Sequence, residues 1–109
     1  MEIFKLSEMK NGWYAGDFEP TCYKNSLFES CYRVHPKGEK WETHFHKEAT
    51  EINLLIRGSM MIQNKQLKSG DVFIIHPYEI ADPVFIEDCA IVCIKTPATL
   101  DDKFSCESC

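Results

Sequence analysis

Hydrophobic and polar positions alternate over short stretches of this chain. In residues 27–34, Phe28 and Tyr32 would share one face of an extended strand, and Arg33 would point to the opposite face. An alternation with a period of two predicts β-strands, whereas a helix repeats every 3.6 residues. The same alternation recurs over residues 41–47, 51–57, 60–63, 71–76, 81–86 and 89–96.

Turn-forming residues separate these stretches. They recur about every 8 to 12 residues, a spacing typical of all-β sandwiches and barrels. No amphipathic pattern is long enough for a substantial helix, and 109 residues form a single domain. We therefore expect one all-β domain over residues 1–109, closed into a barrel that leaves few strand edges exposed. The first turn, His35-Pro36-Lys37-Gly38, is expected to place His35 on the solvated surface.

The composition is that of an acidic globular protein. Hydrophobic residues make up 44% and charged residues 27% of the chain, too apolar a balance for a disordered protein. The net charge of −5 counts against nucleic acid or an anionic membrane as a partner. No apolar run approaches the roughly 18 residues of a membrane-spanning helix, and the first residues lack a secretory signal pattern. We expect a soluble, cytoplasmic protein.

The chain contains six cysteines. In a cytoplasmic protein they are expected to stay reduced rather than to form a disulfide framework. Cys89 and Cys93 fall on one face of a predicted strand, where thiols pack as small hydrophobic groups. Cys106 and Cys109 form a C-x-x-C sequence, but no helix follows it, as a redox site would require. We expect residues 98–109 to form a flexible C-terminal tail.

Two histidines and a glutamate stand out as candidate metal ligands. His44 and His46 are separated by one residue, so on a strand both side chains point to the same face. A turn over residues 47–50 would bring the next strand back antiparallel and place Glu51 beside them. Two neutral imidazoles and one carboxylate suit Fe(II), Mn(II), Zn(II) or Ni(II). Such a set leaves coordination positions open for water or substrate.

This segment resembles the first signature motif of the cupin superfamily. Every fixed position of that motif is matched, by Gly38, His44, His46, Glu51 and Gly58. The resemblance implies a small antiparallel jelly-roll barrel, also called a double-stranded β-helix. It also implies that the two histidines and the glutamate bind a divalent metal ion.

The second cupin motif is matched incompletely. Residues 70–75 follow its Gly-Asp opening and strand, and Pro77 marks its turn. In the family this motif ends in a histidine that is the fourth metal ligand, but the ungapped alignment places Ala81 there. Alanine cannot bind a metal ion. The resemblance therefore covers residues 38–97 and lacks one ligand.

Four groups are candidates to replace the missing ligand. Glu42 precedes His44 by two residues, so regular alternation would point it inward with His44 and His46. His76 ends the preceding strand and can reach in from the barrel mouth. Asp82 adjoins the vacant position, although alternation turns it away unless a bulge shifts the register. The fourth candidate is a water molecule.

The function predicted from these residues is that of a metal-dependent cupin acting on a small polar molecule. Residues 12–20 and 94–97 are similar to short RmlC-like cupins, some of which resemble the sugar-phosphate isomerase and epimerase branch. In an isomerase or epimerase, Glu42 or His76 would move the proton. A dioxygenase using Fe(II) or Mn(II) fits the same ligands. The alternative is a non-catalytic module that binds a metal or small ligand through a degenerate site, as Ala81 suggests.

We also expect a homodimer. Small oligomers most often pair through a two-fold axis. The aromatic-rich residues 13–18 are the candidate contact.

Overall fold

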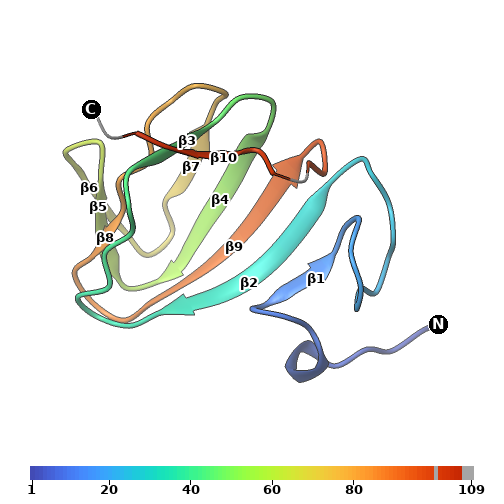
Figure 1. The fold of residues 1–109 in the computed structure, drawn as a ribbon. Helices are drawn as coiled ribbons and strands as arrows, with labels where there is room; N and C mark the ends of the chain where they lie inside the picture. The colour runs from blue at the N-terminus through green and yellow to red at the C-terminus, as the bar shows by residue number, and fades with distance from the viewer. Residues whose placement is uncertain (100, 107–109) are drawn as a thin grey trace.

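Short antiparallel strands make up nearly all of the regular structure in the computed structural model, which describes residues 1–99 and 101–106 (Figure 1). The predicted all-β class is confirmed. None of the helices in these residues is long and apolar enough to cross a membrane. The elements are η1 (Leu6–Glu8), β1 (Trp13–Ala15), β2 (Glu29–His35), β3 (His44–His46), β4 (Thr50–Arg57), β5 (Ser59–Ile62), β6 (Lys65–Lys68), β7 (Val72–Ile75), β8 (Val84–Phe85), β9 (Cys89–Thr96) and β10 (Lys103–Ser105).

The strands form one large sheet and two small ones. The large sheet has the order β1-β2-β9-β4-β7, so β9, the last of these strands along the chain, lies between β2 and β4. The small sheets have the orders β10-β3 and β6-β5-β8. Isolated bridges join them, from Lys40 to Val84 and from His44 to Ala81. The large sheet and the two small ones face each other as the walls of a barrel (Figure 1).

The core lies between these walls, as the alternation predicts. On β4, Asn53 and Leu55 are buried, whereas Ile52, Leu54 and Ile56 between and beside them are exposed. Burying one face of each strand removes apolar area from water and fixes the pairing register. The core cluster consists of Leu55, Met60, Ile62, Ile75, Ala81, Phe85, Cys89 and Ile91.

Gly58, the last residue of the first cupin motif, is required by the backbone. It connects β4 to β5 with a φ of +95°, in the left-handed region that favours glycine. A Cβ atom here would lie 2.4 Å from the carbonyl oxygen of Asp88. Any other residue would therefore be strained and would also clash with the backbone.

Residues 101–106 differ from the flexible tail that was expected over residues 98–109, because part of this segment forms a strand. Strand β10 pairs along the whole of β3, and the Phe104 ring stacks on Phe45 with their centroids 5.6 Å apart. The side chain of Asp102, just before β10, is buried. The local sequence of this polar segment does not predict these contacts, because their partners lie in β3. Cys109 lies outside the described residues.

Candidate metal centre

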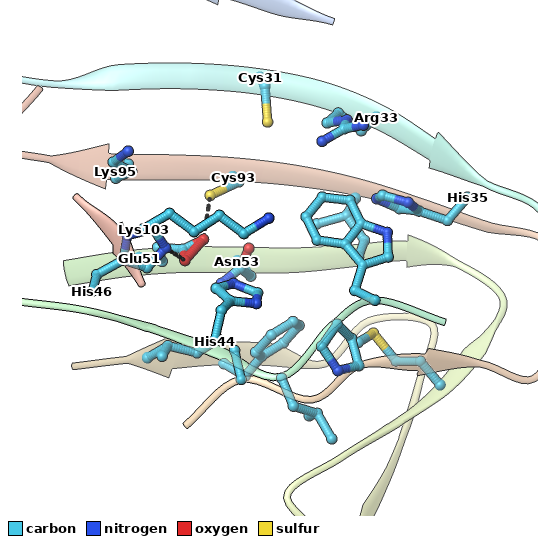
Figure 2. A pocket seen from close by; sticks show the side chains of 18 of the residues that line it. Cys31, Arg33, His35, His44, His46, Glu51, Asn53, Cys93, Lys95 and Lys103 are labelled. Atoms are coloured by element: carbon cyan, nitrogen blue, oxygen red, sulfur yellow. Dashed lines mark hydrogen bonds and ion pairs between the residues drawn. The ribbon is translucent and has the colours of Figure 1, made fainter. Parts of the chain in front are cut away.

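His44, His46 and Glu51 meet inside the barrel. His44 and His46 are the first and last residues of β3, and both are buried with their side chains on its inner face. Glu51, the second residue of β4, approaches from the large sheet (Figure 2). One potential ligand atom from each residue lies within 4.8 Å of the others. The spacing along the sequence thus brings the three residues together as predicted.

Backbone carbonyl groups orient both imidazole rings. His44 Nδ1 lies 3.0 Å from the carbonyl oxygen of Glu42, and His46 Nδ1 lies 2.8 Å from that of Asp102. Because a carbonyl oxygen only accepts hydrogen bonds, each Nδ1 carries the hydrogen and donates it. In the neutral ring this leaves a lone pair on Nε2, the arrangement in which metal-binding histidines are usually held.

His46 and Glu51 lie close enough for a cation to bind between them. His46 Nε2 lies only 3.2 Å from Glu51 Oε2. When Nδ1 carries the hydrogen of the neutral ring, both of these atoms present lone pairs and repel each other. Either a proton on Nε2 or a metal ion bound by both atoms removes that repulsion. The donor set therefore fits a divalent cation.

The electrostatics favour the ligand forms of Glu51 and His44. Burial by itself would raise the pKa of Glu51, but the hydrogen bond and charge of His46 and the Cys93 thiol hold it below its ordinary value. Cys93 Sγ lies 3.6 Å from Glu51 Oε1. Burial also lowers the pKa of His44, which keeps that ring neutral near pH 7. A carboxylate and a neutral imidazole are the forms that bind metal ions.

Asp102 holds the turn that brings Glu51 back to the histidines. Its carboxylate accepts hydrogen bonds from the backbone N–H groups of Lys47 at 3.0 Å, Glu48 at 3.1 Å and Ala49 at 2.9 Å. Burial acts to raise the pKa of Asp102, but these three hydrogen bonds hold it below its ordinary value. Its own carbonyl orients His46. Sequence reasoning missed Asp102 because its partners lie 53 to 56 residues earlier in the chain.

The structure does not bring Glu42 or His76 to this set. Both are exposed, and neither lines the cavity beside the three ligands. The inward orientation expected for Glu42 is wrong because residues 41–43 are not a regular strand, so alternation does not apply there. His76 follows β7 in a turn, where its N–H donates to Glu79 Oε1 at 3.0 Å.

Ala81 lies beside His44 in the same wall of the barrel. The two residues form a backbone bridge, with N–H to carbonyl distances of 2.8 and 3.0 Å in the two directions. The neighbouring Asp82 turns away, and its carboxylate accepts a hydrogen bond from the Gln63 N–H at 2.8 Å. None of the three candidate residues, Asp82, Glu42 and His76, therefore fills the position of the fourth ligand.

A cavity of about 300 Å³ opens beside the three candidate ligands. It is lined by polar and charged side chains that the motif did not indicate, among them Arg33, Asn53 and Lys103 (Figure 2). His35 also lines it, which corrects the expectation of a solvated surface position. As the last residue of β2 it points inward, and its ring stacks on Phe85 with centroids 4.2 Å apart.

Comparisons with known proteins agree on the fold. No protein-family model matches the sequence, and no curated protein matches it. A double-stranded β-helix protein from Klebsiella pneumoniae is similar over 97% of this chain and 92% of its own, with 15% identity and a TM-score of 0.71. An RmlC-like cupin from Shewanella frigidimarina matches with 20% identity over 71% of this chain and 72% of its own, at a TM-score of 0.62. Pac13, a nucleoside dehydratase, matches with 10% identity over 75% of this chain and 70% of its own, at a TM-score of 0.64.

These likenesses, together with the strand order, define the class of the fold. The chain has the double-stranded β-helix fold, as the Klebsiella pneumoniae protein does. The fold expected from the motif is confirmed.

Proposed function

We propose that the protein binds one divalent transition-metal ion through His44, His46 and Glu51 and acts on a small polar molecule in the adjoining cavity. The observation that carries the proposal is the convergence of three ligand atoms within 4.8 Å, with both histidines held by carbonyl groups. Fe, Mn, Zn and Ni all accept two imidazoles and a carboxylate.

Each of the protein groups has a definite task at such a site. When bound, the metal ion would supply Lewis-acid chemistry for isomerisation or epimerisation, or oxygen chemistry as Fe(II) or Mn(II). Glu51 supplies the negative charge, and the carbonyl oxygen of Asp102 holds the His46 ring in place. The small side chain of Ala81 leaves space beside His44 for water or for the molecule that is bound.

The competing function is a binding module without catalysis. Two observations favour it: Ala81 replaces the fourth ligand, and neither Glu42 nor His76 reaches the cavity to move a proton. In favour of an enzyme, Pac13 carries out dehydratase chemistry on a similar fold. A fold by itself does not determine function. Turnover assays on metal-loaded protein with hydroxy-keto sugars, and with O₂ consumption as a second readout, separate the two.

Metal binding should stabilise the protein at pH 7.5 but not near pH 5. The imidazoles and the carboxylate must be deprotonated to bind, so protons compete with the metal ion as the pH falls. We expect a chelator to lower the melting temperature at the higher pH and to leave it unchanged at the lower one. Metal analysis of the same samples should give nearly one equivalent before chelation. An unchanged melting temperature at pH 7.5, with metal below about a tenth of an equivalent after reconstitution, would contradict the proposal.

We also propose a homodimer, formed through the outer face of the large sheet. Ile52 pairs with Ile74 on one side and Ile94 on the other, and Leu54 pairs with Val72 in the next row. All five side chains are exposed and form one continuous apolar face. A contiguous apolar face of this kind is typical of an interaction surface. Two copies of the chain could pack these sheet faces together around a two-fold axis.

This face replaces residues 13–18 as the candidate contact. Trp13 lines the internal cavity, and the Tyr14 hydroxyl accepts a hydrogen bond from the Ser30 hydroxyl at 2.6 Å, so both contact their own chain. Light scattering after size exclusion should give twice the chain mass of 12.6 kDa. Ile52→Lys should give a monomer, whereas Ile3→Lys, at an exposed position outside the sheet, should not. A monomeric wild-type protein contradicts the proposal.

A further inference from the structure

We infer that the small molecule in the cavity is an organic anion whose carboxylate or phosphate oxygens are bound by Asn53, Arg33 and Lys103. This inference rests on the proposed function, because it names the class of molecule bound beside the candidate metal centre. Among the described residues, it is carried by one buried donor that has no hydrogen-bond partner and by two cations that form no ion pair.

Asn53 carries the unpaired donor. It lies on β4 two residues after Glu51, so both side chains are on the same face of the strand and both line the cavity (Figure 2). The side chain is only 6% exposed. Its Nδ2 atom is the one buried side-chain nitrogen or oxygen, among the described residues, that has no hydrogen-bond partner. Leaving a buried N–H group unpaired costs free energy, so a ligand oxygen is the natural partner.

Arg33 and Lys103 reach the same space from opposite walls. Arg33 is on β2 in the large sheet, and Lys103 begins β10 in a small sheet. The Arg33 guanidinium carbon lies 5.0 Å from the centre of the Trp41 ring, and Lys103 Nζ lies 4.6 Å from it. The Trp41 ring is in turn 6.1 Å from the His44 ring. The two positive charges therefore both lie near the Trp41 indole, next to the candidate metal ligands.

Arg33 and Lys103 have no acidic partner among the residues that the structure describes. Within residues 1–99 and 101–106, no ion pair involves Arg33 or Lys103. Lys95, which also lines the cavity, shows the contrast, because its Nζ lies 3.4 Å from Glu29 Oε1. The charge at Arg33 and Lys103 is thus available to a ligand, and the aromatic contacts hold both side chains in place.

The charge of the cavity differs in sign from that of the whole chain. The chain has a net charge of −5, yet the cavity is lined by Arg33, Lys95 and Lys103 and by a single carboxylate, Glu51. A concave site of one sign focuses its field and attracts ions of the opposite sign. A metal ion held by Glu51 would add further positive charge. A neutral molecule would leave both cations unpaired, whereas an anion would form charge-assisted hydrogen bonds with them.

The test compares three six-carbon molecules that differ in one end group. Metal-loaded protein is titrated by calorimetry with gluconate, with sorbitol 6-phosphate and with neutral sorbitol. At least one of the two anions should bind about tenfold or more tightly than sorbitol, because charge-assisted hydrogen bonds are stronger than neutral ones. The anion that binds more tightly shows whether the site prefers a carboxylate or a phosphate group.

Variants show whether the anion contacts the predicted side chains rather than the metal ion alone. Arg33→Met, Lys103→Met and Asn53→Leu should each weaken anion binding by about tenfold, and the first two should leave sorbitol binding unchanged. The matched controls are Arg57→Met and Lys65→Met, at exposed positions outside the cavity. Circular dichroism and metal content of every variant confirm that it is folded and loaded.

Three results would overturn the inference. They are equal affinities for the anions and sorbitol, equal anion binding by the cavity variants and their controls, and no detectable anion binding at about 10 mM. Each of these leaves the proposed function intact if the protein holds its metal ion. Conversely, titration of chelator-treated protein decides the anion site even if metal analysis shows that the proposed metal site is wrong.

Discussion

His44→Ala is expected to reduce the metal content of the purified protein from nearly one equivalent to below about a tenth, and to weaken metal affinity at least about 100-fold. The change removes one of three ligand side chains. It keeps the backbone bridge to Ala81, which uses only main-chain atoms. The barrel should therefore stay folded while the site loses its ion. Elemental analysis gives the metal content, and competition with a chromophoric chelator gives the affinity.

A second ligand variant and a matched control complete this experiment. Glu51→Gln preserves the shape of the side chain but removes its negative charge, so it should cause a comparable loss. His76→Ala removes an exposed histidine outside the cavity and should leave metal binding unchanged. If His44→Ala binds metal as tightly as His76→Ala does, these three residues are not the site.

Asp102→Asn is expected to lower the free energy of unfolding by about 2–3 kcal/mol, measured by urea denaturation. Both oxygens of the buried carboxylate accept backbone hydrogen bonds, Oδ1 from Lys47 and Oδ2 from Ala49, and Glu48 contacts both. An amide has only one oxygen, so at least one N–H group would face an NH₂ group. The turn between β3 and β4 would lose the group that holds it.

The neighbouring Asp101→Asn is the matched control. Asp101 is exposed and has a φ of +56°, a conformation that asparagine adopts readily, so its substitution should change stability by less than about 0.5 kcal/mol. Equal stabilities of the two variants would contradict the importance of the Asp102 carboxylate. If the turn loosens, metal affinity should also fall, by about tenfold, because Asp102 orients His46 through its carbonyl group.

The effect of Asp102 should depend on pH in a definite direction. Its pKa in the folded protein lies below its ordinary value of 3.8, so the unfolded chain takes up a proton first as the pH falls. The stability that the carboxylate contributes is therefore present above that ordinary value and is lost as the pH falls through the folded value. The stability difference between wild type and Asp102→Asn should shrink over this range. A constant difference would mean that the carboxylate charge is not responsible.

Local spacing predicted the strands and the candidate ligands but failed where the backbone departs from a regular strand. His44 and His46 lie within β3, so their separation by one residue places them on one face. Glu42 has the same spacing from His44, yet it lies outside the strand and is exposed. His35 shows the opposite case, because a turn-forming neighbour suggested the surface although it is the last inward residue of β2.

By itself, the sequence determined that this chain folds as an all-β barrel and that two imidazoles and a carboxylate meet inside it. Those features depend on separations of a few residues, which a single strand or hairpin converts into position. Only the tertiary structure decided which other groups surround them. Arg33, Asp102 and Lys103 come from strands and loops far from His44, His46 and Glu51 in the chain. Their meeting depends on the order and register of strand pairing, and no local pattern contains that information.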